Sequence, residues 1–411
     1  MKYFFIALFF LSTLGFISCD TKDDEKYADY IVAKPLTISK EDFKNGVTVL
    51  PPKFIEESGK IYAYESFIFI NDTYQGVHVI DNKDPKNPKR IAYIKIPGNV
   101  DISVKGNYLF ADSLSDLVVI DFSNLANIHV VNRLEGVLRN NGVWPVADFY
   151  EYDDIDYENE IVLGWETVSE PRLISEYEER FSSGGEIFDM VSNNAAVGQG
   201  GSLARFKIVN DYLYAVDSHT INVFDISNLE NPKDLEDVYA GFDIETIFNR
   251  NQYLFLGSKS GMYIYDISSP STPQFVSEFQ HGTACDPVVV DDKYAYVTLR
   301  GGNSCGATES GLFVIDIQDI KNPILLKSYA MEEPYGLGLK DNLLFVCDGK
   351  AGLKVYDKTD VENLEALNHF ENIVTFDVIP LENSLLIVGD GFLYQYQYQE
   401  RSIALLSTLS L

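Results

Sequence analysis

Basic residues are scarce in this chain of 411 residues, which carries 32 Lys and Arg against 62 Asp and Glu. The resulting net charge is −30. A nucleic-acid partner requires a basic surface, because phosphate contacts supply much of the affinity. Anionic lipid also attracts basic segments. The charge therefore argues against nucleic acid and against charge-driven membrane docking, and it predicts a solvated acidic exterior.

Sequence motifs that commit a chain to a reaction are absent. There is no serine elbow, no paired His and Asp, no carboxylate pair at catalytic spacing and no zinc-binding spacing of cysteines. The glycine-rich stretch Gly198–Ser202 follows no strand of a βαβ unit, so it does not form a phosphate loop. We predict no catalytic residue and no cofactor, although a site assembled from distant segments would leave no such motif.

The N-terminus has the composition of a targeting segment. Lys2 precedes an apolar run from Tyr3 to Phe10, and the apolar stretch is too short for a clear membrane-spanning helix. The segment Phe16–Cys19 resembles a lipobox, in which a small residue precedes the cysteine that becomes acylated. The resemblance implies a signal peptide at residues 1–18, cleavage before Cys19 and anchoring by acyl chains. An ordinary cleaved signal with a chance cysteine is the alternative.

Residues 19–50 are predicted to form a tether and a lead-in to the folded domain. Asp20, directly after the cysteine, resembles an inner-membrane retention signal, and a plain polar tether is another interpretation. The next charged residues resemble a tag for export to the surface of Gram-negative cells. We predict a surface-exposed outer-membrane lipoprotein that touches the membrane only through its anchor. The residues of the candidate export tag are Lys22, Asp23, Asp24 and Glu25.

A short apolar motif that ends in an acid recurs along the chain and defines its organisation. Most copies lie about 40 residues apart, with one long and one short insertion between copies. A degenerate last copy, Phe392–Tyr396, lacks the acid. The acids that end the other copies are Asp81, Asp121, Asp225, Asp266, Asp316 and Asp357.

Each unit has the same predicted anatomy. Two short strands precede the motif, the motif forms a third strand, and a turn rich in Asp, Asn and Pro leads to a fourth. The motif is apolar throughout, as in strands that are covered on both faces. These features predict an all-β fold, a seven-bladed β-propeller of four-stranded blades over residues 51–411. The alternative is eight blades, with a degenerate blade in residues 137–202.

Two copies of the motif, Leu117–Asp121 and Leu312–Asp316, resemble the LVIVD repeat family of bacterial surface lipoproteins. The likeness covers roughly residues 54–136 and 203–411. It implies a β-propeller fold and adds almost nothing about chemistry. The function therefore has to be inferred from the residues that interrupt the repeats.

An acidic insertion at about 137–202 separates the second and third units. It holds both tryptophans, Trp144 and Trp165, and we predict that they form a binding face together with Tyr157. Long loops on a rigid scaffold often carry binding sites. Alternating acids here are a candidate Ca²⁺ site, although the glycine turn of a calcium loop is missing and a solvated hairpin is the other interpretation. These acids are Asp154, Asp156, Glu158 and Glu160.

Three cysteines remain after the one in the lipobox. In a propeller, the loops between second and third strands share one face with the connections between blades, and this places Cys285 and Cys305 on the face of the insertion. We predict a disulfide between them that pins the loop from Leu299 to Ser310, with two free thiols as the alternative. Cys347 lies in an apolar run and is predicted to be a buried, inert thiol.

Binding is the function that these features favour. The predicted partner is an extracellular protein or a glycan that the loop-rich face engages. One alternative is a hydrolase or lyase that acts on an extracellular polymer at the propeller channel. A polar cluster gathered from the first strands of several blades would support that alternative. Another alternative is a structural envelope component without a discrete ligand.

Overall fold

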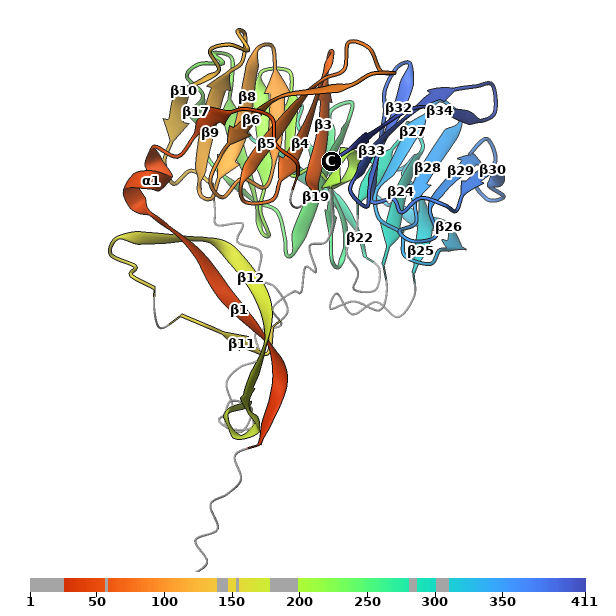
Figure 1. Ribbon diagram of the computed structural model, residues 1–411. Coiled ribbons are helices and arrows are strands. Elements are labelled where there is room, and N and C mark those ends of the chain that lie inside the picture. The colour runs from red at the N-terminus through yellow and green to blue at the C-terminus, as the bar shows by residue number, and fades with distance from the viewer. Residues whose placement is uncertain are drawn as a thin grey trace, which may run out of the picture.

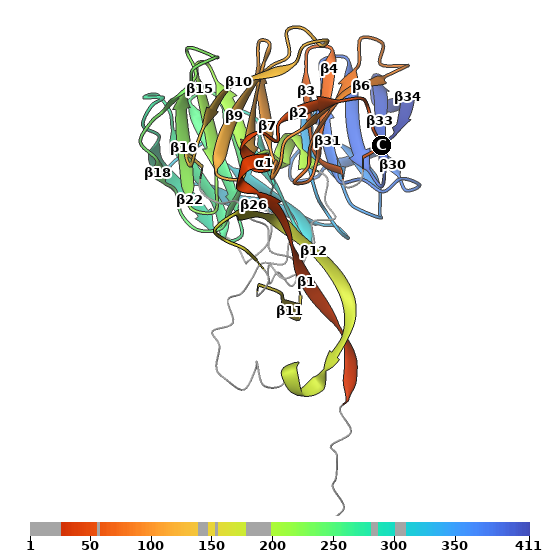
Figure 2. The same ribbon diagram turned by 60° about the vertical axis from the view of Figure 1, so that its left-hand side comes forward.

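The computed structural model describes residues 26–55, 58–138, 147–152, 155–177, 199–280, 287–300 and 310–411. In these residues, seven sheets of four or more strands stand around a common axis, and a three-stranded sheet extends from one end of the ring (Figure 1, Figure 2). We call the large sheets blades 1 to 7 in chain order and the small sheet the stalk. None of the helices in the described part of the chain is long and apolar enough to cross a membrane.

Among the first three blades, blades 1 and 3 carry additions to the basic four-stranded pattern, and blade 2 has four strands. In blade 1, β2 (Thr48–Leu50) covers the outer edge and β13 (Gln199–Gly200) pairs with the innermost strand. The other strands of blade 1 are β3 (Ser58–Tyr64), β4 (Phe67–Asp72), β5 (Gly76–Asp81) and β6 (Lys89–Lys95). Blade 2 holds β7 (Ile102–Lys105), β8 (Tyr108–Ser113), β9 (Asp116–Asp121) and β10 (His129–Leu134). Blade 3 holds β14 (Phe206–Val209), β15 (Tyr212–Val216), β16 (Thr220–Asp225), β17 (Lys233–Asp234) and β18 (Val238–Tyr239).

The last four blades are plain antiparallel meanders. Blade 4 holds β19 (Ile244–Arg250), β20 (Tyr253–Ser258), β21 (Gly261–Asp266) and β22 (Gln274–Gln280). Blade 5 holds β23 (Val288–Val290), β24 (Tyr294–Leu299), β25 (Gly311–Asp316) and β26 (Ile324–Ala330). Blade 6 holds β27 (Leu337–Lys340), β28 (Leu343–Cys347), β29 (Leu353–Asp357) and β30 (Glu365–Phe370). Blade 7 holds β31 (Asp377–Pro380), β32 (Ser384–Gly389), β33 (Phe392–Tyr398) and β34 (Ile403–Ser410).

Hydrophobic cores between neighbouring blades hold the ring together. Phe69 of blade 1 shares one core with Val118 of blade 2, and Ile61 of blade 1 shares another with Leu386 of blade 7. The innermost strands also touch in succession, from β3 through β7, β14, β19, β23 and β27 to β31 and back to β3. The middle strands are therefore buried on both faces, which explains why the motif is apolar throughout.

The acid that ends each motif has a structural role. Its carboxylate accepts a hydrogen bond from the backbone N–H two residues later and so closes the turn between the third and fourth strands. In one copy, the hydrogen bonds from Ser123 also lower the pKa of Asp121. The pairs and their N···O distances are Asp81–Lys83 3.0 Å, Asp121–Ser123 2.7 Å, Asp225–Ser227 2.9 Å, Asp266–Ser268 2.6 Å, Asp316–Gln318 2.9 Å and Asp357–Thr359 2.9 Å.

The stalk corrects two expectations. Its central strand, β1 (Tyr27–Ser39), pairs antiparallel with β12 (Glu160–Leu173) over its whole length and parallel with β11 (Phe149–Tyr150). Residues 27–35 are therefore a strand and not a tether, because the insertion supplies the partner that a tether lacks. In the described part of 137–202, β11 and β12 join this three-stranded sheet and β13 pairs with blade 1, so these residues do not form the degenerate four-stranded blade of the eight-blade alternative.

A short connector joins the stalk to the ring. Helix α1 (Lys40–Lys44) begins where β1 ends, and the Ser39 hydroxyl caps it by accepting a hydrogen bond from the N–H of Asp42 at 3.0 Å. Arg133, at the end of blade 2, donates to the Asp116 carboxylate at 2.7 Å and stacks over the Phe43 ring of α1 at 4.7 Å. This half-buried contact fixes the root of the stalk on blade 2.

Candidate binding face

One end of the ring collects most of the features that the sequence singled out. We call it the insertion-side face, and it is formed by the loops between second and third strands and by the connections between blades. The stalk leaves the ring from this end (Figure 1). The short insertion starts after Arg300 and ends before Ser310, so it is attached to the same face. The opposite face is built from the turns that the repeat acids close.

Nine residues named in the predictions lie outside the described residues, so what was expected of them stays a prediction. They are Cys19, Lys22, Asp23, Asp24, Glu25, Trp144, Asp154, Cys285 and Cys305. Cys347 is described: it is a fully buried free thiol in β28, as predicted. Burial raises the pKa of this thiol well above its usual value, which makes it a poor nucleophile.

The structure does not bring Trp165 and Tyr157 into one patch. Trp165 is half-buried in β12, where it packs edge-on against Tyr150 and Tyr152 with ring centroids 5.6 and 5.3 Å away. Tyr157 is 61% exposed and lies in the turn before β12. About 16 Å of strand separates the start of β12 from Trp165. Trp165 therefore packs within the stalk, whereas Tyr157 is open to a partner next to the ring.

The acids of the insertion shape a turn. The expected alternation along one strand edge is wrong, because residues 157–159 form a turn. Asp156 accepts hydrogen bonds from the Asn159 side chain at 2.8 Å and from the N–H of Glu158 at 3.1 Å, and the Asn159 bond lowers its pKa. Glu160 is the first residue of β12. In the part of the chain that the structure describes, no group of three or more His, Cys, Asp or Glu is placed to hold a metal ion.

The chain that returns from the insertion occupies the axis of the ring. Its 3₁₀ turn η1 (Gly201–Leu203) contacts inner strands of five blades, namely β3, β19, β23, β27 and β31. The Ser202 hydroxyl is buried there and accepts a hydrogen bond from the N–H of Leu337 at 3.0 Å. The insertion is thus tied to the centre of the ring as well as to the stalk.

A buried ion pair fixes the strands beside this plug. Lys60 Nζ lies 2.6 Å from Asp101 Oδ2, and the two side chains are 5% and 3% exposed. The same carboxylate oxygen accepts hydrogen bonds from the N–H groups of Arg205 and Phe206. One carboxylate therefore links blade 1, blade 2 and the start of blade 3.

Two carboxyl groups near the axis have raised pKa values. Burial raises the pKa of Asp112 to about 6, and burial also raises the pKa of Glu245. Raised pKa values of this kind suit a general acid. Asp112 Oδ1, however, already accepts three hydrogen bonds. The donors are the N–H of Val100 at 2.7 Å, the N–H of Asp101 at 3.0 Å and the side chain of Asn99 at 2.7 Å. The Asp112 carboxyl group therefore holds the backbone of the connection between blades 1 and 2 in place.

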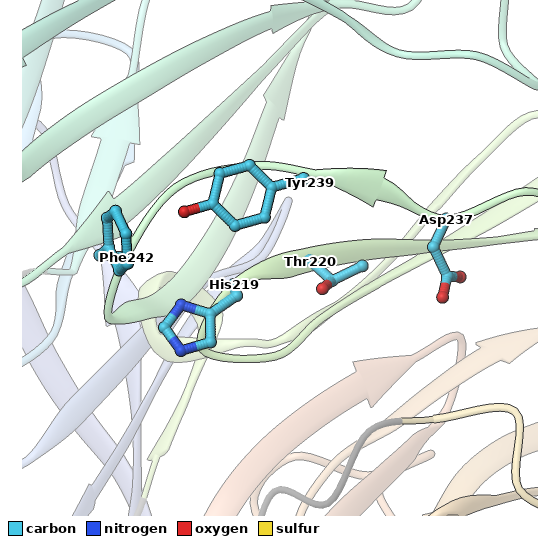
Figure 3. A pocket seen from close by; sticks show the side chains of 5 residues that line it. All are labelled: His219, Thr220, Asp237, Tyr239 and Phe242. Atoms are coloured by element: carbon cyan, nitrogen blue, oxygen red, sulfur yellow. The ribbon is translucent and has the colours of Figure 1, made fainter.

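A pocket of about 320 Å³ opens on the insertion-side face at blade 3. Figure 3 shows the rings of His219, Tyr239 and Phe242 gathered at one end and the side chains of Thr220 and Asp237 at the other. Tyr239 and Phe242 are each 62% exposed, and their rings meet edge-on with centroids 6.0 Å apart. The His219 ring meets Phe242 edge-on at 5.4 Å.

Sequence reasoning missed this pocket. His219 comes from the loop between the second and third strands of blade 3, whereas Tyr239 and Phe242 come from its last strand and the following connection. The available signal was two aromatic residues flanking Gly241 in a connection between blades. Local sequence does not show that this connection folds against the His219 loop, where the N–H of Ala240 donates to the His219 carbonyl at 2.8 Å.

Comparison with known proteins agrees with this architecture, which is that of an all-β propeller. Four segments match the LVIVD repeat, at residues 98–135, 200–238, 250–280 and 281–331. The chain is thus a propeller repeat protein that carries LVIVD repeats. A search of curated proteins found no match.

Solved structures with similar folds include three that differ widely in sequence. The computationally designed protein Ika8 has a TM-score of 0.51 and 11% identity, over 85% of this chain and 87% of its own. Sqt1 of Saccharomyces cerevisiae has a TM-score of 0.50 and 10% identity, over 86% and 85%. BamB from Moraxella catarrhalis has a TM-score of 0.47 and 8% identity, over 90% and 99%. At such identities the likeness to Ika8 and Sqt1 shows the fold alone.

Proposed function

We propose that this protein is a lipid-anchored binding module that engages an extracellular partner through its insertion-side face. The observation that carries the proposal is the pocket between Tyr239 and Phe242, whose rings are largely exposed on that face. Exposed aromatic rings beside polar groups are typical of binding surfaces. The opposite face consists of turns whose acids are used to hold backbone groups.

The proposal includes a seven-bladed ring. It is supported by the succession of contacts between the seven innermost strands, which returns from blade 7 to blade 1. Arg90 of blade 1 also donates to the Ser410 carbonyl of blade 7 at 2.7 Å. A closed ring gives the loops of one face a rigid base, and rigid bases favour defined binding sites.

The proposed anchor adds an orientation. If Cys19 carries acyl chains, the lipid is joined to the stalk at Tyr27, at the end of the stalk that lies far from the ring (Figure 2). β1 has 13 residues, so the stalk holds the ring about 40 Å beyond that point. The proposed location is the outer surface of a Gram-negative cell, with Lys22, Asp23, Asp24 and Glu25 as the export tag.

The anchor is testable by substitution. Cys19→Ala removes the thiol that acyl chains require, so we expect the variant to move from the membrane fraction to the soluble fraction. Thr21→Ala is the matched control and should stay with the membrane. Mass spectrometry of the mature N-terminus should find acyl mass on Cys19. An unmodified Cys19, or a Cys19→Ala variant that stays in the membrane, would refute the anchor.

The hydrolase or lyase alternative receives less support. A polar cluster does lie near the axis, as that alternative requires, and it includes Asp101 and Asp112. These carboxylates bind backbone N–H groups and Lys60, and η1 fills the adjacent axis. These contacts give the cluster a structural role that requires no catalysis. We therefore keep the proposal that the protein is a binding module.

A further inference from the structure

The blade 3 pocket combines an apolar platform with a polar edge. The platform is made by the rings of Tyr239 and Phe242, which meet edge-on. His219 lies at the same end as these rings and Thr220 and Asp237 lie at the other end (Figure 3), and we call these three polar side chains the polar edge. Aromatic faces carry partial negative charge and attract the partly positive C–H groups of a flat, weakly polar ligand. The polar edge can at the same time exchange hydrogen bonds with groups on the rim of that ligand.

The hydrogen bonds of His219 define what its ring offers a ligand. Nδ1 lies 3.1 Å from the carbonyl oxygen of Gly241, and a carbonyl only accepts, so Nδ1 carries the proton. In the neutral ring, Nε2 is then an acceptor. The Thr220 hydroxyl group belongs to a residue that lines the same pocket. An acceptor nitrogen and a hydroxyl group in one pocket suit a ligand that itself carries hydroxyl groups.

The backbone around the pocket is held by several contacts, which limits the loss of conformational entropy on binding. Asp217 accepts hydrogen bonds from the N–H groups of His219 at 2.8 Å and Thr220 at 2.9 Å. Gly241 has φ +128°, and a Cβ there would stand 2.9 Å from the Tyr263 ring, so only glycine fits. The backbone segments that carry the platform and the edge are thus held by hydrogen bonds and by close packing.

Charge and size narrow the class of ligand. Asp237 lines the pocket and the chain carries a net charge of −30, so an anionic ligand would be repelled. A volume of about 320 Å³ lies at the lower end of the range for small-molecule sites. A neutral sugar ring has an apolar face, a hydroxylated rim and no negative charge, and it fits a cavity of this size.

We propose that this pocket binds one neutral pyranose unit of an extracellular glycan, packed in the angle between the Tyr239 and Phe242 rings and hydrogen-bonded at its rim by His219. The inference rests on the proposed binding function and names the ligand class of the same face. Because the two rings supply most of the apolar contact area, removing either ring should weaken binding more than removing the histidine.

The test is titration calorimetry of the mature chain with glucose, galactose, mannose and N-acetylglucosamine oligosaccharides, and with an oligouronate of equal length. We expect at least one neutral series to bind and the oligouronate not to bind. Tyr239→Ala and Phe242→Ala should each weaken binding at least tenfold, and His219→Ala less. Phe275→Ala is the matched control, because Phe275 is 55% exposed and lies on the outer strand of blade 4 near the opposite face.

Thermal unfolding of each variant shows whether it is folded, and these exposed positions should shift Tm little. The proposal is overturned if none of the neutral oligosaccharides binds. It is also overturned if the double variant Tyr239→Ala, Phe242→Ala binds as tightly as the natural chain. That failure is distinct from failure of the binding function, since a protein partner would still attach to the insertion-side face in the cross-linking experiment described at the end of the Discussion.

Discussion

Replacing Lys60 with methionine is expected to lower the free energy of unfolding by about 3 to 5 kcal/mol, because it leaves the buried Asp101 carboxylate without its ion-pair partner. The remaining partners of Asp101 are backbone N–H groups, including that of Ile102 at 2.7 Å. They stabilise the charge only in part. The same substitution loosens the link between blade 1 and the start of blade 3, so the ring should also unfold less cooperatively.

Urea unfolding of the mature chain at pH 7 measures this effect. Arg250→Met is the control, because Arg250 pairs with Asp292 at the surface and its loss should cost about 1 kcal/mol or less. The double variant Lys60→Met, Asp101→Asn removes the unpaired charge and should recover part of the lost stability. A Lys60→Met variant as stable as Arg250→Met would show that the pair does not hold the ring.

The second large effect concerns Asp112. Asp112→Ala removes the acceptor of three hydrogen bonds in a buried site and should cost about 3 kcal/mol. Asp112→Asn keeps an oxygen in the same place and should cost far less at pH 4. The two variants therefore separate the shape of the site from its charge.

The pH dependence follows from the pKa of about 6 in the folded chain. An unfolded Asp has a pKa near 3.9, so the stabilisation by protonated Asp112 is complete below about pH 4 and is lost as the pH rises through about 6. The Asp112→Asn variant has no ionisable group at this position, so it cannot lose this stabilisation as the pH rises. Its stability relative to the natural chain should thus rise by roughly 3 kcal/mol between pH 4 and pH 7. A difference in unfolding free energy that is independent of pH over that range would show that Asp112 is ionised throughout.

The repeat made the ring predictable from sequence. Each motif is apolar on both faces because it lies between two neighbouring blades, and each motif ends in an acid because that carboxylate closes the following turn. Both properties are local, so they recur wherever the same unit recurs. Spacing then indicates how many units the chain holds.

The stalk was not predictable in the same way. β1 and β12 are separated by more than a hundred residues, and neither repeats a pattern found elsewhere in the chain. Residues 27–35 look like a tether until the insertion supplies a partner strand. Trp165 looks like a binding residue until Tyr150 and Tyr152 pack against it.

The pocket lies beyond sequence reasoning for a related reason. It exists because the connection after blade 3 folds back on a loop some 20 residues earlier, and that fold depends on Gly241 and on the Asp217 carboxylate. A single exposed aromatic residue would need no explanation. Two of them closing a cavity against His219 become meaningful only in three dimensions.

The most direct test of the binding face is photo-cross-linking on intact cells. A photo-reactive phenylalanine analogue replaces Phe242 in one variant and Phe275 in the other, because these phenylalanines have similar exposure and lie towards opposite faces. Illumination should attach a glycan or a protein to the chain with the analogue at Phe242 and leave the chain with the analogue at Phe275 unmodified. Equal labelling at both positions, labelling only at Phe275, or labelling at neither would contradict a binding function for the insertion-side face.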